Sequence, residues 1–276
     1  MFERPGSTPS WPTANWWLFP PQTQELQLDE KWAFVFKKRQ HCTPEELEQE
    51  RVGDCWDHIA FDPEHRLVLG VIVGRRSQGN IQQLAEVVKL QLEGRIPRLI
   101  TTDAYKGYAE VFQRVFGAVI KLAHKRGEPK PAAKRKIPRE LTFATVTKVM
   151  EKGRMVEVSR DLVLGSEKNL HAALRTSSVS STINTSFIER HNATDRHQNA
   201  RKHRKTYCFS KDLEVHKAAG GFVLYSYNFC WCVSTLRKKR QDGTYQKRTP
   251  AMAAGLSDHV WSIAEWLRYP AVDRSR

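Results

Sequence analysis

The sequence of 276 residues predicts an α/β protein built around a mixed five-stranded sheet flanked by helices. Short apolar runs rich in β-branched residues alternate with longer segments of helical periodicity, which is the pattern of such folds. Hydrophobic residues make up 40% of the chain, an ordinary share for a globular protein with a sizeable core. We therefore expect one large domain, or one domain that carries an insertion.

Three strands are predicted first. Alternating apolar residues predict a strand over residues 26–36. Two further apolar runs, WDHIAF and RLVLGVIVG, flank residues 62–65, where an Asp-Pro-Glu-His segment is typical of a turn. The two runs therefore predict a hairpin.

Two helices and two strands are predicted to follow. Residues 79–94 place Ile81, Leu84 and Val88 on one helical face, and they end in a glycine that favours a helix C-terminus. A strand ending in TTD, a helix over about 105–116 and the strand-like run AVIKLAH come next. Three antiparallel strands, a helix, a strand, a helix and a strand are the order expected of a ribonuclease H-like core.

The remaining sequence predicts an insertion and further helices. Three prolines and five basic residues at 127–140 indicate a linker, and the turn at 151–153 predicts a basic β-hairpin outside the minimal core. The predicted organisation is an extended lead-in at 1–24, the first part of the core at 25–126, a basic insertion at 127–183, a helix bearing Glu189 with a following core helix at 184–236, and a basic link with a C-terminal helix at 237–276.

The charge distribution indicates a polyanionic partner. The net charge is +15, and residues 121–211 alone carry 21 Lys and Arg against 8 Asp and Glu, a net charge of +13. Such a run can be a solvated face, but beside a carboxylate site we interpret it as binding DNA phosphates.

The composition also indicates a compartment. The five cysteines contain no C-x-x-C pair, which argues against a zinc ribbon or a disulfide framework. The sequence has no signal-peptide pattern and no apolar stretch of membrane-spanning length. We expect a cytoplasmic, nucleoid-associated protein in a reducing compartment.

Three acidic residues lie where a two-metal nuclease needs them. Asp29 lies in LQLDEKWAFVF, Asp103 follows LITT, and Glu189 lies on a helix rich in Arg, Lys and His. In-line attack on a phosphodiester needs an activated oxygen on one side and a stabilised leaving oxygen on the other, which two metal ions can supply. Mg²⁺ and Mn²⁺ prefer carboxylate oxygens, so this set predicts a site for two such ions.

Each acid also has a structural interpretation. Asp29 can be a strand-edge charge beside Glu30, Asp103 can cap the following helix, and Glu189 can close a capping box with Ser186. Three other acids compete for the first position: Asp54, Asp57 and Asp62, with Asp57 the best placed. The order of Asp29, Asp103 and Glu189 on two strands and a helix favours a joint catalytic role.

Polar and basic residues around Glu189 are expected to contact DNA. Asn192 and Arg196 lie three and seven positions after Glu189, so they share its helical face. The predicted DNA-binding residues are Arg190, Asn192, Arg196, Arg201, Lys202, Arg204 and Lys205, together with Lys134, Arg135 and Lys136 of the insertion.

Four segments carry a family resemblance. IERHNATDRHQNARKHRKTYCFSKDLEVH resembles the catalytic-glutamate region of bacterial DDE transposases of the insertion sequence 1 family. LDEKWAFV and TTDAYKGY resemble the two aspartate motifs of that family, and TPAMAAGLSDHVWSIAEWL resembles the end of related transposases. The resemblance covers residues 26–268 and is strongest at 187–216.

The resemblance implies a reaction and partners. Asp29, Asp103 and Glu189 would be the metal-binding triad of a ribonuclease H-like transposase that cleaves transposon ends and joins them to target DNA. We expect double-stranded DNA as substrate, a homo-oligomer on DNA, and a separate or fused N-terminal DNA-recognition module, because no such module precedes Asp29. Two alternatives stay open: a nuclease that cuts without joining, and a non-catalytic DNA-binding relic.

Overall fold

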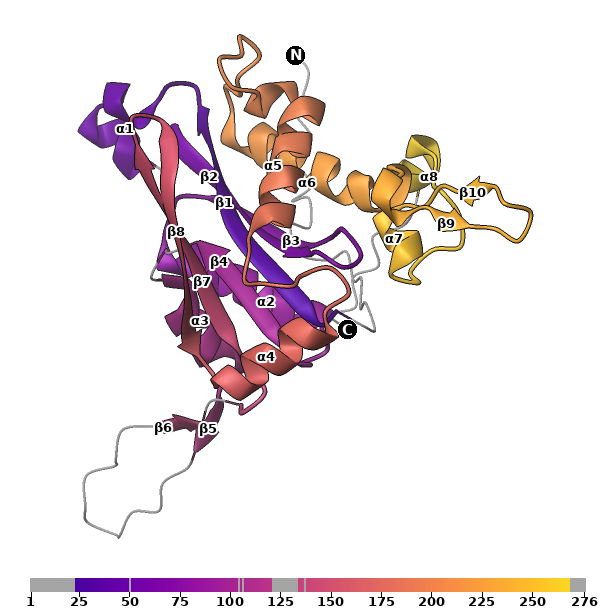
Figure 1. The fold of residues 1–276 in the computed structure, drawn as a ribbon. Coiled ribbons are helices and arrows are strands. Elements are labelled where there is room, and N and C mark those ends of the chain that lie inside the picture. Colours follow the sequence, from indigo (N-terminus) through magenta and orange to yellow (C-terminus); the bar gives the residue numbers. More distant parts are fainter. Residues whose placement is uncertain are drawn as a thin grey trace, which may run out of the picture.

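The computed structural model describes residues 23–49, 51–103, 105, 107–120, 134–136 and 138–268, with the backbone alone for 119–120 and 134–136. A central six-stranded mixed sheet organises this part of the chain in the order β3-β2-β1-β4-β7-β8 (Figure 1). Its strands are β1 (Glu25–Val35), β2 (Gly53–Asp62), β3 (Leu67–Gly74), β4 (Leu99–Asp103), β7 (Phe143–Glu151) and β8 (Arg154–Leu164).

The first three strands and the following helix confirm the sequence-based expectation. β1, β2 and β3 are antiparallel, and the turn after β2 is closed by the Asp62 carboxylate, which accepts from the backbone N–H groups of Glu64 and His65. The helix α2 (Gln78–Gln91) buries Ile81, and Gly94 beyond it has φ +76°, a conformation that favours glycine.

The last core strand differs from the prediction. The described part of AVIKLAH forms β5 (Ala118–Ile120), which pairs with β6 (Lys134–Lys136) in a separate two-stranded sheet. β4 pairs in parallel with β1 on one side and with β7 on the other, and β7 forms a hairpin with β8. The expected hairpin exists, but it belongs to the central sheet, which therefore has six strands instead of five.

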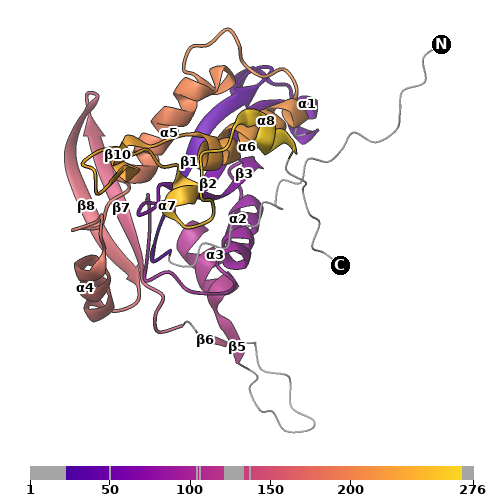
Figure 2. The ribbon, with the colours of Figure 1, turned by 90° about the vertical axis from the view of Figure 1, so that its right-hand side faces the viewer.

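Helices cover both faces of the sheet. The helices α2 and α3 (Gly107–Phe116) lie on one face, while α4 (Glu167–Thr176) and α5 (Ser186–Gln198) lie on the other (Figures 1 and 2). α6 (Leu213–Cys230) packs on β3. Leu28, Ile59 and Phe112 are among the fully buried core side chains, each of which contributes about 1.5–3 kcal/mol by leaving water.

Short elements complete the described chain. They are η1 (Arg39–His41), α1 (Pro44–Glu48), η2 (Ala200–Lys202), η3 (Ser234–Leu236), β9 (Lys238–Lys239), β10 (Tyr245–Gln246), α7 (Pro250–Ala253) and α8 (Ile263–Arg268). The basic link thus forms the small β9–β10 hairpin, and Trp266 of α8 packs on Phe229 with ring centroids 5.6 Å apart. The lead-in predicted at 1–24 lies almost entirely outside the described residues.

Among the described residues, none of the helices combines the length and apolarity needed to span a bilayer.

Candidate active site

The two predicted aspartates lie on neighbouring parallel strands, Asp29 within β1 and Asp103 at the end of β4. Pairing of β1 with β4 runs as far as Leu28 opposite Thr102, so Asp29 and Asp103 are the next residues on each strand. β4 ends there, while β1 continues and the β7–β8 hairpin rises on the other side. Beyond the last residue of β4, none of the described strands lies between β1 and β7. Both carboxylates lie where this opening in the sheet begins.

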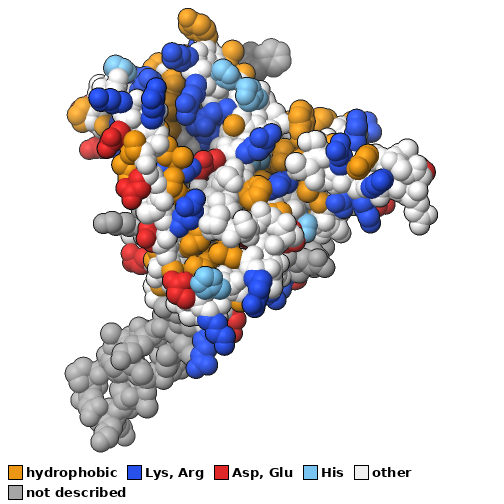
Figure 3. Space-filling view, viewed as in Figure 1, with side chains coloured by type: hydrophobic (Ala, Val, Ile, Leu, Met, Phe, Trp, Pro, Cys, Tyr) orange, Lys and Arg blue, Asp and Glu red, His pale blue; other side chains and the backbone are white. Residues whose placement is uncertain are grey.

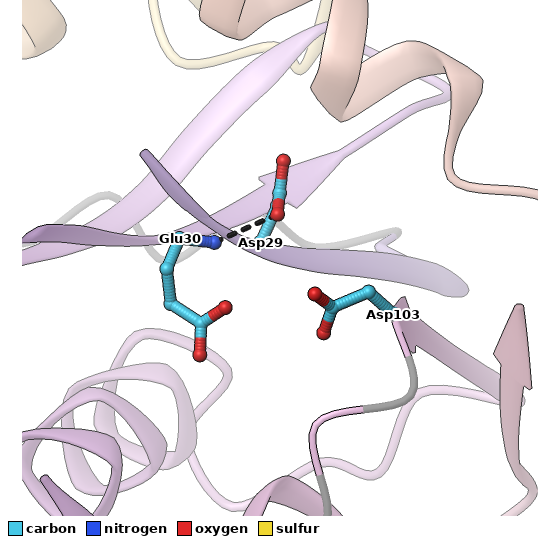
Figure 4. A group of neighbouring side chains, drawn as sticks. All are labelled: Asp29, Glu30 and Asp103. Atoms are coloured by element: carbon cyan, nitrogen blue, oxygen red, sulfur yellow. Dashed lines mark hydrogen bonds between the residues drawn. The ribbon is translucent and has the colours of Figure 1, made fainter. Parts of the chain in front are cut away.

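A third carboxylate joins them from the opposite face of β1. Oxygen atoms of Asp29, Glu30 and Asp103 lie within 4.8 Å of one another (Figure 4). Because successive residues of a strand point to opposite faces, Asp29 and Glu30 approach Asp103 from two sides. Sequence reasoning missed Glu30 as a site residue, although its position beside Asp29 was visible.

Charge crowding and burial perturb this acidic cluster. Burial, with the nearby Asp103 carboxylate, raises the pKa of Asp29 to about 6. The same two causes raise the pKa of Glu30 to about 7. Among the described residues, the buried Glu30 Oε1 has no hydrogen-bond partner. A cation bound among these oxygens would relieve the repulsion, so the donor set fits a hard divalent metal ion.

Three alternate residues of β1, whose side chains face α5, hold this helix against the strand. Gln27 Oε1 accepts from the Ile188 backbone N–H at 3.1 Å, and Asp29 Oδ2 accepts from Asn192 Nδ2 at 2.7 Å. Lys31 forms a buried ion pair with Asp195. Side chains two residues apart on the strand thus contact residues three or four apart on the helix. These contacts fix the position of α5 along β1.

Glu189 does not belong to the cluster formed by Asp29, Glu30 and Asp103. It lines one open cavity with Asp29, Glu30, Asn192 and Arg196, and its charge contributes to the raised pKa of Asp29. The Thr185 hydroxyl donates to Glu189 Oε1 at 2.5 Å, and Lys148 of β7 forms an ion pair with the same oxygen. The Ser186 capping box is not formed, because the helix N-cap is Thr185.

Arg76 supplies a cation on the other side of the cluster. Its Nη2 lies 3.3 Å from Glu30 Oε2 and 3.8 Å from Asp103 Oδ2, and its guanidinium stacks 4.0 Å over the Tyr105 ring. Arg76 and Lys148 thus neutralise carboxylates from opposite sides, and neither was singled out from the sequence.

The competing acids have structural roles. Asp57 is fully buried, and its Oδ2 lies 3.0 Å from Lys31 Nζ and 2.5 Å from Lys202 Nζ. Burial alone would raise the pKa of Asp57, but the two ammonium groups hold it well below its usual range. Asp54 accepts from the Arg39 backbone N–H, and Asp62 closes the β2–β3 turn.

Two predicted DNA-binding residues point inward instead. Lys202 is buried against Asp57 and does not face a ligand, whereas Asn192 is buried with its amide on Asp29 at the wall of the cavity. The helix also ends earlier than expected: Asn199 is extended, and the segment that follows runs through η2. Arg201 is half-buried, while Arg204 and Lys205 are exposed beyond the helix end.

The remaining predicted DNA contacts are placed as follows. Arg190 is exposed on α5, and Arg196 and Arg204 line the cavity with Asp29 and Glu189. Lys134, Arg135 and Lys136 form β6, whose side chains lie outside the description. Figure 3 shows Lys, Arg and His side chains gathered around the upper part of this face, over α5 and the segment after it.

The fold and the acidic cluster define an α/β protein with a mixed sheet that is compatible with a ribonuclease H-like fold. The family model of the IS1 transposase matches residues 139–229. The match covers 91 of the 276 residues, and over this segment it agrees with the resemblance found in the sequence.

The match runs from β7 into α6 and contains Glu189, whereas Asp29 and Asp103 precede it. Comparisons with curated proteins and with solved structures gave no match.

Proposed function

We propose that this chain is the catalytic transposase of an insertion sequence, which cleaves DNA strands at the element ends and joins them to target DNA. The observation that carries the proposal is the placement of Asp29 and Asp103 on adjacent parallel strands, with Glu189 of α5 lining the same cavity as Asp29. The family match makes a transposition-related function the expected one.

The donor set suits two Mg²⁺ or Mn²⁺ ions, held by Asp29, Asp103 and Glu189. When bound, such ions lower the pKa of the attacking hydroxyl or water and stabilise the leaving oxygen. Glu30 is a further oxygen donor at the same cluster. Asn192 orients Asp29 through its amide, a contact of the kind that fixes ligand geometry in metal sites.

The cations around the cavity would position the DNA. Arg196 and Arg204 line the cavity itself, and Arg190, Arg201 and Lys205 extend the positive surface along α5 and beyond it. Contacts of this kind hold the phosphate backbone without reading sequence. Lys134, Arg135 and Lys136 stay proposed DNA contacts, although β6 lies at the other end of the molecule from α5 (Figures 1 and 2).

We propose that a separate or fused DNA-recognition module recognises the element ends. We also propose that the active protein is a homo-oligomer on double-stranded DNA in the bacterial cytoplasm. Both expectations come from the family resemblance. They predict that the chain alone cleaves DNA with little preference for one end sequence.

The test is a strand-transfer assay with pre-cleaved and uncleaved element ends in Mg²⁺ or Mn²⁺. Asp29→Asn, Asp103→Asn and Glu189→Gln should each abolish cleavage and joining while duplex binding persists, and Asp54→Asn should leave both intact. Cleavage without joining by the unmodified chain would establish the nuclease alternative. Full activity of any triad variant would remove that residue from the site.

A further inference from the structure

A surface of aromatic side chains lies beyond the acidic cavity, and the proposed reaction does not use it. We call it the aromatic platform, and its residues are Trp32, Phe34, Phe36, Tyr207 and Phe209. Tyr207 is 99% exposed, Phe36 51% and Trp32 38%. A single exposed ring is ordinary, but exposed rings grouped on one surface indicate an interaction site.

The platform joins two segments that are distant in sequence. The rings of Trp32 and Phe34 are 5.8 Å apart, and those of Phe34 and Phe209 are 5.2 Å apart. The Phe36 N–H donates to the Ser210 carbonyl oxygen at 2.7 Å, which ties the segment after η2 to the end of β1. The exposed rings therefore sit on an ordered support.

Phe36 has a strained backbone. Its φ is +63°, in the left-handed region that bulky residues rarely adopt. The strained residue carries a half-exposed ring at the end of β1. Strained backbone conformations cluster at functional sites, so this one supports a binding role for the surface.

Cations border the platform on both segments. Lys38 Nζ lies 5.9 Å from the Trp32 ring centroid, and Arg204 and Lys205 are exposed shortly before Tyr207. His203 and Arg204 also line the cavity that contains Asp29. One continuous basic segment therefore leads from the acidic cavity to the exposed rings.

Exposed rings flanked by cations match the chemistry of unpaired nucleotides. Bases stack on aromatic faces, and phosphates pair with Lys and Arg, whereas duplex DNA keeps its base faces inside the helix. We propose that the aromatic platform binds single-stranded DNA, so that unpaired bases next to the cleavage point stack on Tyr207 and Trp32. The link to cleavage rests on the proposed function, but the binding itself does not.

The experiment measures binding of a fluorescent oligothymidine of about 12 nucleotides by anisotropy, in EDTA so that no cleavage occurs. Tyr207→Ala and Trp32→Ala should each weaken binding by about 10-fold, the typical loss of one stacked base. Tyr207→Phe should restore it. Tyr245→Ala is the matched control, because Tyr245 is also 52% exposed beside a basic residue, on the distant β10.

Salt dependence separates stacking from charge. Lys205→Gln should reduce the slope of log affinity against log salt by about 0.7, and Tyr207→Ala should leave the slope unchanged. Because Tyr207 is almost fully exposed, its loss does not threaten the fold.

Wild-type oligothymidine affinity in Tyr207→Ala and Trp32→Ala would overturn the proposal. So would an equal loss of duplex affinity in both variants. The proposed function is tested by a different assay, cleavage of DNA by the unmodified chain in Mg²⁺. Absence of cleavage in that assay would not change the conclusion from oligothymidine binding.

Discussion

The side-chain amide of Asn192 donates a hydrogen bond to the Asp29 carboxylate across 2.7 Å and joins α5 to β1 at the acidic cavity. Asn192 lies one helical turn from Glu189, so a single helix face both supplies one proposed ligand and orients another.

Loss of this contact should weaken metal binding. Asn192→Ala removes the donor that fixes Asp29, and outer contacts of this kind typically contribute about 10–100-fold to metal affinity. Calorimetric titration with Mn²⁺ should show that loss, whereas Thr194→Ala on the same helix should not. Equal affinities in both variants would mean that Asn192 has only a packing role.

Removing the cation beside Glu189 should have the opposite effect. Lys148 forms an ion pair with Glu189 and competes with a metal ion for the same oxygen. Lys148→Met should therefore tighten Mn²⁺ binding by several-fold, as expected for one partly exposed charge pair. Lys152→Met on the same hairpin removes the same charge away from Glu189 and is the control. Weaker binding in Lys148→Met would contradict this competition.

Stability should depend on pH through Asp29. Its pKa is raised from 3.8 to about 6 in the folded chain, so its ionisation destabilises the fold progressively as pH rises through that interval. Asp29→Asn should stabilise the protein by up to about 3 kcal/mol at pH 8 and by almost nothing below pH 4. Urea unfolding at several pH values without metal measures this difference. A stabilisation that is the same at pH 4 and pH 8 would contradict the assignment.

Breaking a buried ion pair should lower the free energy of unfolding more than breaking an exposed one. Asp57→Asn leaves Lys31 and Lys202 without their shared counter-ion and should destabilise the chain by about 3–5 kcal/mol. Glu46→Gln breaks the partly exposed pair with Lys37 and should lower the free energy of unfolding far less, because solvent screens that pair. Comparable losses in urea unfolding would show that the Asp57 pairs are dispensable.

Helices and strands with local sequence signals could be predicted from the sequence. The pairing of strands distant in sequence could not. The α2 helix followed from its periodicity and its C-terminal glycine. AVIKLAH and the β7 segment both have apolar strand patterns, and nothing local indicates which of them pairs with β4. The prolines and basic residues at 127–140 therefore suggested that the hairpin lay outside the core.

The same limit applies to the site. Asn192 was placed on the correct helix face, but its partner Asp29 is 163 residues away. Lys202 lies in a basic run typical of a DNA-binding surface, yet it is buried against Asp57, 145 residues distant. Lys31 of the apolar β1 was not singled out from the sequence, and its buried partner Asp195 is 164 residues away.

The most direct test of the two-metal site is anomalous diffraction from crystals of the chain with bound DNA and Mn²⁺. The proposal predicts Mn²⁺ peaks coordinated by Asp29 and Asp103, with Glu189 released from Lys148 to complete the site. Mn²⁺ coordinated by Asp29, Glu30 and Asp103, with Glu189 still paired to Lys148, would contradict the proposed triad.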